Sequence, residues 1–181
     1  MTRGLRIAAA IAAALAGAGG TVSASAAASF ADMFGEGCVS TTASSSTGVD
    51  VSMTCAAFGW TDATAAQATA GVLTFTVHFA ATSAGCPPVD ASAHVHYSDA
   101  GGTVDVSSSG DTWTYAGNDL ATGAPLCQLT SPGPASVAAT GAYAGMNGVT
   151  LYEAVIPGVS SLLAQNPDAG STWVDIGVAA G

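Results

Sequence analysis

The chain has 181 residues, and twelve Asp and Glu against two Lys and Arg give it a formal net charge of −10 at pH 7. Both basic residues, Arg3 and Arg6, lie at the N-terminal end, so no Lys or Arg occurs after them. Binding to nucleic acid or to an anionic membrane surface is therefore excluded, because no basic patch can form to neutralise phosphates. The excess of carboxylates instead favours solubility and attracts cations.

The N-terminal segment has the order of a secretory signal peptide. The two arginines precede an uncharged apolar run from 7 to 18, and the small residues Ala24-Ser25-Ala26 follow. A charged start, an apolar run and a small-residue cleavage site are the parts of such a signal. We therefore predict a signal peptide over residues 1–26, cleaved near 26–28. The protein is then secreted and extracellular, with a single β domain over 27–181.

Short strands are predicted for most of this domain. A turn of helix is expected first within 29–37, from the spacing of Phe30, Met33 and Phe34, and a loop or edge within the Ser/Thr-rich stretch 39–50. Apolar and polar residues then alternate with period two, which is typical of strands with one buried face. The predicted strands span 49–55, 72–79, 91–98, 103–116, 125–130, 135–143, 149–156 and 172–178.

Turn residues complete this pattern. Ser108-Ser109-Gly110-Asp111 is predicted to turn a β-hairpin within 103–116. One short helix, Val159–Gln165, is expected near the C-terminus, ending before Pro167. Eight or nine short strands favour an all-β fold, an antiparallel β-sandwich of the immunoglobulin-like or a related type, with a small barrel as the alternative.

Four cysteines follow the predicted signal peptide, and an even number in an exported chain indicates two disulfide bonds. The cysteines are Cys38, Cys55, Cys86 and Cys127. Three pairings are possible, and we favour Cys38–Cys55 with Cys86–Cys127, because each then closes a loop of moderate length.

The three histidines are the candidate metal ligands. His94 and His96 are two residues apart on a predicted strand, so they point to the same face. His78 lies on the polar face of the preceding predicted strand, and consecutive strands are usually neighbours. Three imidazoles on one face could bind zinc or copper.

A second candidate site is aromatic. Trp113 and Tyr115 share one face of the predicted hairpin and could stack on a ligand such as a sugar ring. No catalytic motif stands out, so a non-catalytic binding module for a protein, carbohydrate or small-molecule ligand is the favoured function. A metal-binding extracellular protein and a small extracellular hydrolase remain as alternatives.

Overall fold

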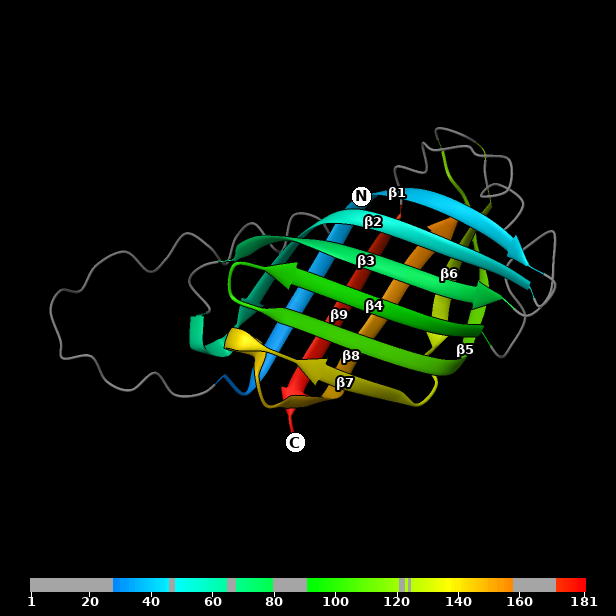
Figure 1. The fold of residues 1–181 in the computed structure, drawn as a ribbon. Coiled ribbons are helices and arrows are strands. Elements are labelled where there is room, and N and C mark those ends of the chain that lie inside the picture. Colours follow the sequence, from blue (N-terminus) through cyan, green and yellow to red (C-terminus); the bar gives the residue numbers. More distant parts are fainter. Residues whose placement is uncertain are drawn as a thin grey trace, which may run out of the picture.

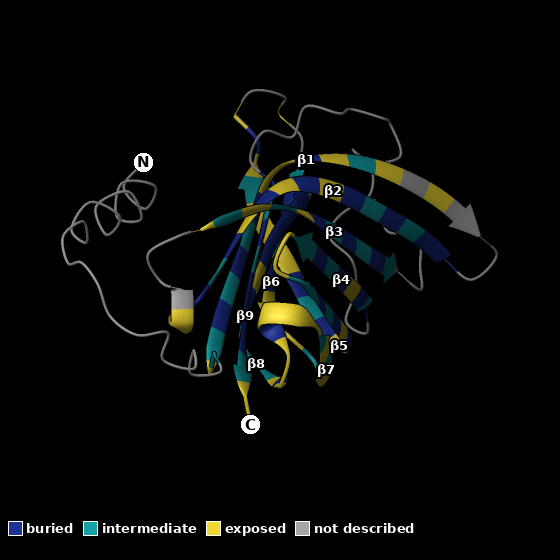
Figure 2. Ribbon diagram, turned by 60° about the vertical axis from the view of Figure 1, so that its left-hand side comes forward, coloured by how far each residue is buried: buried dark blue, intermediate teal, exposed yellow. Residues whose placement is uncertain are grey.

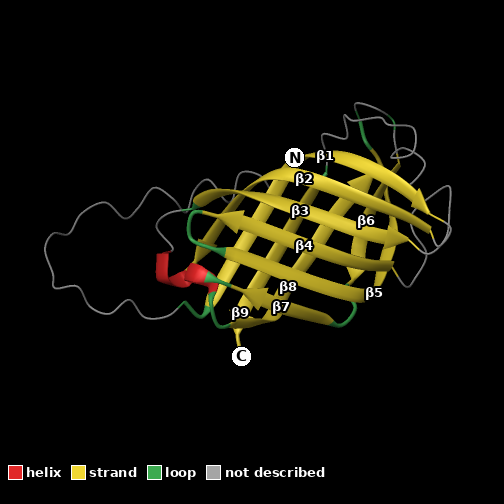
Figure 3. Cartoon of the chain, viewed as in Figure 1, coloured by secondary structure: helices red, strands yellow, loops and turns green. Residues whose placement is uncertain are grey.

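The computed structural model describes residues 28–45, 48–64, 68–79, 91–120, 123, 125–157 and 172–181. The predicted signal peptide and the predicted helix at Val159–Gln165 lie outside these residues. Nine strands dominate the described part, with two single 3₁₀ turns, η1 (Asp62–Thr64) and η2 (Gly141–Tyr143) (Figure 3). The strands are β1 (Phe30–Ser45), β2 (Gly48–Thr61), β3 (Thr69–Phe79), β4 (Ala91–Asp99), β5 (Thr103–Asn118), β6 (Pro125–Ser131), β7 (Ala135–Ala139), β8 (Met146–Pro157) and β9 (Trp173–Ala180).

This content confirms the predicted all-β class. The predicted helical turn within 29–37 is wrong, because these residues belong to β1 from Phe30 onward. A helix with the length and apolar character to cross a membrane is not found within the described ranges.

The strands form one antiparallel sheet that closes into a barrel, so the predicted β-sandwich is wrong. Hydrogen-bonded neighbours follow the order β4-β3-β2-β1-β9-β8-β6-β5, and β5 pairs with β4 to close the ring of eight strands. The ninth strand, β7, lies against the first half of β5. Barrels and sandwiches share an alternation of inner and outer residues, so only the pairings around the ring separate the two folds.

Two bent strands let this sheet close. β1 pairs with β9 only as far as Glu36, and its register to β2 shifts directly afterwards, where Gly37 has a φ of 62°. β5 pairs with β7 up to Ser108 and with β6 from Thr112, and Gly110 between them has a φ of 74°. Bulges and glycines of this kind bend a strand. In Figure 1, β2 to β5 accordingly cross in front of β9 and β8.

The bend in β5 lies where the sequence predicts a hairpin turn, and that prediction is wrong because Thr103–Asn118 is one strand. Asp111 is fully buried at the bend. Its Oδ1 accepts a hydrogen bond from the Gly133 N–H at 2.8 Å, and its Oδ2 accepts one from the Ser108 hydroxyl at 2.7 Å. Gly133 lies in the short segment between β6 and β7. The Asp111 carboxylate therefore links the bend in β5 to that segment.

Buried residues follow the strands around the barrel (Figure 2), and their side chains form one hydrophobic core cluster. Successive residues of a strand point to opposite faces, so buried and more exposed residues alternate along much of β2, β3 and β4. The largest fully buried side chains are Tyr97, Phe75, Met33, Met53, Leu73, Ile156, Ile176, Val49, Val51, Val77 and Val95.

The predicted disulfide Cys38–Cys55 is confirmed, and it links β1 to β2 just past the bend in β1. Cys127 is also disulfide-bonded. Cys86 lies outside the described residues, so the predicted Cys86–Cys127 bridge is not described.

Substitutions at Gly110 should test the bend in β5. A Cβ at this position would meet no atom within 4 Å. The loss of stability on adding a side chain therefore comes from the backbone conformation alone. We expect Gly110→Ala to lower the free energy of unfolding by about 1 kcal/mol, Gly110→Val by more and Gly110→Asn by less, because Asn tolerates positive φ. Urea unfolding measures the series, and an equal loss in all three variants would contradict a backbone origin.

Candidate functional site

The three predicted metal ligands lie on the outer surface of the barrel, each beside a carboxylate. His78 Nδ1 lies 2.7 Å from Asp50 Oδ1 on β2. His96 Nδ1 lies 2.8 Å and His94 Nε2 lies 3.4 Å from the same atom, Oδ1 of Asp105 on β5. All three imidazoles are therefore placed by neighbouring carboxylates.

These carboxylates direct the imidazoles to opposite sides. His78 contacts β2, whereas His94 and His96 contact β5, although β3 and β4 are adjacent as predicted. Within the described part of the chain, no three His, Cys, Asp or Glu side chains are grouped as metal ligands would be. The zinc or copper site stays a prediction without a geometric argument in its favour.

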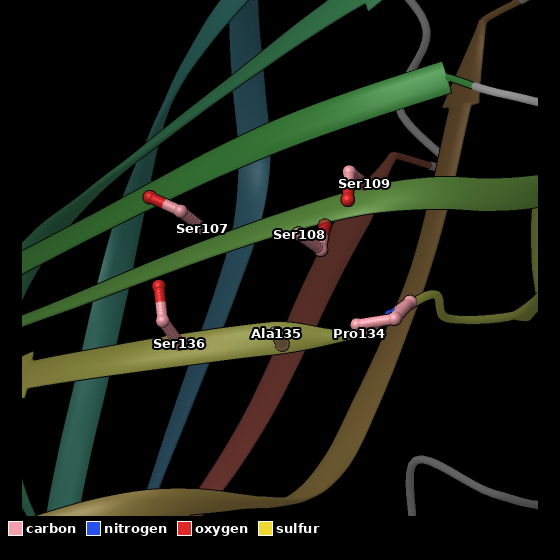
Figure 4. Close-up of a pocket in the computed structure, with 6 residues that line it drawn as sticks. All are labelled: Ser107, Ser108, Ser109, Pro134, Ala135 and Ser136. Carbon is pink, nitrogen blue, oxygen red and sulfur yellow. The ribbon is translucent and has the colours of Figure 1, made fainter.

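A shallow hollow lies beside His94 on the same outer surface (Figure 4). Ser107, which lines it, is the cross-strand partner of His94. Four serines supply hydroxyls and no charged side chain lines the hollow, which is formed by Ser107, Ser108, Ser109, Pro134, Ala135 and Ser136. Hydroxyls alone can orient a polar ligand, but they bring neither a nucleophile with a base nor an apolar contact surface.

The predicted aromatic platform is not formed. Trp113 is only 5% exposed and packs against Phe75 in the core, with ring centroids 6.1 Å apart. Tyr115, in contrast, is 62% exposed, and its hydroxyl donates to Asn118 Oδ1 at 2.6 Å. A register shift just before Trp113 and another after Tyr115 disturb the regular alternation here. The two rings therefore do not offer one surface to a ligand.

A different set of aromatic residues gathers on the outside of β1, β2 and β9, and acidic residues lie beside them on β1, β8 and β9. On β1 the inner positions Ala31 and Met33 are buried, and the residues between and after them face outward. We call this surface the aromatic–acidic face and define it by Phe30, Asp32, Phe34, Glu36, Phe58, Trp60, Glu153, Trp173 and Asp175.

Strand pairing makes the aromatic–acidic face continuous. Phe34 is the cross-strand partner of Phe58 on one side and of Asp175 on the other. Asp175 in turn lies opposite Glu153. Asp32 lies opposite Trp60. Directly opposite side chains are close enough to interact, so rings contact rings, rings contact carboxylates and carboxylates contact each other across the four strands.

The rings occur in two pairs on this face. Phe30 and Trp60 have centroids 5.3 Å apart at an interplanar angle of 55°. Phe34 and Trp173 are 6.3 Å apart at 30°. Phe58, between the two pairs, is 48% exposed. Tilted pairs at these distances are favourable aromatic contacts, so the rings hold each other in place while part of their surface stays in solvent.

Asp32 and Asp175 form a carboxyl pair within the aromatic–acidic face. Burial is the main cause that raises the pKa of Asp175 to about 7, and a hydrogen bond with Asp32 and the negative charges of Asp32 and Glu153 add to it. One oxygen of each carboxyl, Oδ1, is shielded from solvent and has no hydrogen-bond partner. Asp175 therefore keeps its proton up to near neutral pH.

Asp99 provides a contrast, because donors from the protein surround it. The Tyr97 and Tyr143 hydroxyls lie 2.9 and 2.6 Å from its Oδ2. The N–H groups of Gly101 and Gly102 donate to its Oδ1 at 2.7 and 3.0 Å. All four contacts of the Asp99 carboxylate come from the protein itself, and the contact with Tyr143 holds η2 to the barrel. Glu153 of the aromatic–acidic face is instead exposed.

The sequence contains a signal for this face. Phe30, Asp32 and Phe34 alternate with period two, as do Trp173 and Asp175. The spacing of Phe30, Met33 and Phe34 also fits a turn of helix, and that interpretation hides the period-two pattern of β1.

Removing the Asp175 carboxyl should change how stability depends on pH. Folded Asp175 keeps its proton up to about pH 7, above the ordinary value of 3.8, so the native state binds more protons than the unfolded chain between these values. This group therefore favours folding at low pH, and the stabilisation is lost as pH rises through 7. We expect Asp175→Asn to gain stability relative to the wild type at pH 8 and to gain less at pH 5, measured by urea unfolding.

Asp62→Asn is the control with the opposite sign. The Ser29 hydroxyl donates to Asp62 and is the main cause that lowers the pKa of this exposed carboxyl. Its contribution is present at neutral pH and is lost on acidification. The assignment of Asp175 would be contradicted if both variants changed the pH dependence of the free energy of unfolding in the same direction.

No protein-family model, no curated protein and no solved structure matches this chain. The function is therefore argued from the geometry of the aromatic–acidic face.

Proposed function

We propose that the protein is an exported, non-catalytic binding module that takes its ligand on the aromatic–acidic face. The single observation that carries this proposal is the position of five aromatic rings on the outside of one part of the barrel, between four carboxylates. Rings and carboxylates placed side by side supply both the apolar contact and the polar orientation that ligand recognition needs.

The packing of the interior supports an outer site. Large side chains, among them Tyr97, Phe75 and Trp113, occupy the inside of the barrel. An eight-stranded barrel has an interior just wide enough for side chains or for one small ligand. The buried residues of the barrel strands form a single hydrophobic cluster. The packing of the described strands therefore favours binding on the outside of the barrel.

The aromatic residues of the face are not needed to fill the core. Phe58 is about half exposed, and its neighbour Ala56 shows that a small residue is accepted on the same face of β2. Aromatic side chains are enriched at the centres of binding surfaces, where they bring a large contact area at a small cost in conformational entropy. A binding role would explain why these rings lie on the outer surface of the barrel.

A small extracellular hydrolase is the second candidate, and the carboxyl pair favours it. Asp175, with a pKa raised to about 7, is a suitable general acid near neutral pH, and Asp32 and Glu153 are carboxylates beside it. These side chains extend from the outer face of sheet strands, whereas the hollow seen in Figure 4 lies over β5 and β7. Binding is therefore the function that the geometry supports best.

The binding proposal can be tested with the full-length secreted protein on defined glycan and peptide arrays. We expect binding to at least one ligand class, with affinity reduced about tenfold or more in Phe58→Ser and in Trp173→Ser, since an aromatic anchor contributes about 2 kcal/mol or more. Tyr115→Ser is the matched control, because it also removes an exposed ring, and it should bind as the wild type does.

Circular dichroism and thermal unfolding establish that each variant is folded. Loss of binding in Tyr115→Ser with retention in Phe58→Ser would place the site elsewhere. Turnover of a glycan, abolished by Asp175→Asn, would replace the binding module by the hydrolase.

A further inference from the structure

We propose that the aromatic–acidic face binds a segment of a partner protein that bears arginine or lysine side chains. The inference rests on the proposed function and adds the chemistry of the ligand. It follows from the charge of the face, from the rings beside the carboxylates and from the lack of competing cations in the chain.

Charge complementarity indicates a cationic ligand. Four carboxylates, those of Asp32, Glu36, Glu153 and Asp175, lie on adjacent strands of the face. The chain has no Lys or Arg after Arg6, and each of its three histidines contacts Asp50 or Asp105 outside this face. An anionic partner would be repelled, and a neutral sugar would leave the clustered charges uncompensated.

The aromatic rings match the same ligand. A guanidinium group stacks on an aromatic ring and binds a carboxylate in its own plane, and an ammonium group is attracted to the ring face. Phe34 and Trp173 lie next to Asp175, and Trp60 lies opposite Asp32. Each carboxylate of the pair therefore has a ring beside it, which lets one cationic side chain contact both.

The carboxyl pair links binding to proton release. Asp175 lies opposite Glu153 on β8 and diagonally across from Asp32 and Glu36 on β1, and all three neighbours are acidic. A cation near them favours the ionised form of Asp175, whose pKa is about 7 in the free protein. Binding should therefore strengthen as pH rises from 6 to 8 and weaken on acidification.

The experiment titrates the full-length secreted protein with an oligoarginine peptide, followed by tryptophan fluorescence and calorimetry. Salt is held at about 0.15 M, where charges separated by more than about 8 Å are screened. We expect saturable binding that weakens about tenfold or more in the double variant Asp32→Asn/Glu153→Gln and in Phe58→Ser. The matched control, Asp50→Asn/Asp105→Asn, also removes two carboxylates and should change the affinity less than about twofold.

Each outcome separates this inference from the proposed function. Equal weakening in both double variants would overturn the inference, because binding would then reflect net charge rather than the face. No binding of oligoarginine, with binding of a neutral oligosaccharide that depends on Phe58, would overturn the cationic ligand and leave the binding module in place. Binding that is stronger at pH 6 than at pH 8 would also contradict the inference.

Discussion

Closure of the sheet into a barrel, in which the first strand β1 pairs with the last strand β9, is the constraint on which the other features depend. An eight-stranded barrel has a narrow interior, so its inner positions must share limited space. On β1 these inner positions are Ala31, Met33 and Gly35, of which two are small. The interior is filled by larger residues from facing strands, such as Phe75 and Tyr97. Phe30 and Phe34 then face outward, and the aromatic–acidic face results from the way the barrel closes.

The bends that allow closure also depend on local chemistry. Gly37 and Gly110 have positive φ values at the points where β1 and β5 change pairing partners. The Cys38–Cys55 bridge lies just past the first bend, and the buried Asp111 carboxylate binds Gly133 at the second. Each bend is thus held by one strong contact to a neighbouring segment, which limits the freedom that a glycine would otherwise bring.

The absence of Lys and Arg after Arg6 determines how the carboxylates find partners. Asp50 and Asp105 contact histidines, whereas Asp99 accepts hydrogen bonds from tyrosine hydroxyls and backbone N–H groups. Asp175 has neither kind of partner at its Oδ1, and burial beside Asp32 raises its pKa to about 7. A stretch of chain without Lys or Arg must satisfy its carboxylates by these weaker means, or by a cation that comes from another molecule.

The sequence by itself determined the all-β class, the strand positions along most of the chain and the Cys38–Cys55 pair, because alternation and loop length are local properties. It also placed His78, His94 and His96 on outer strand faces. The barrel, the divergence of these imidazoles, the core position of Trp113 and the aromatic–acidic face were decided only by the tertiary structure. Each depends on which strands pair across the closed sheet, and on bulges that change the face a residue occupies, so residues distant in sequence such as Asp32 and Asp175 meet only in the folded chain.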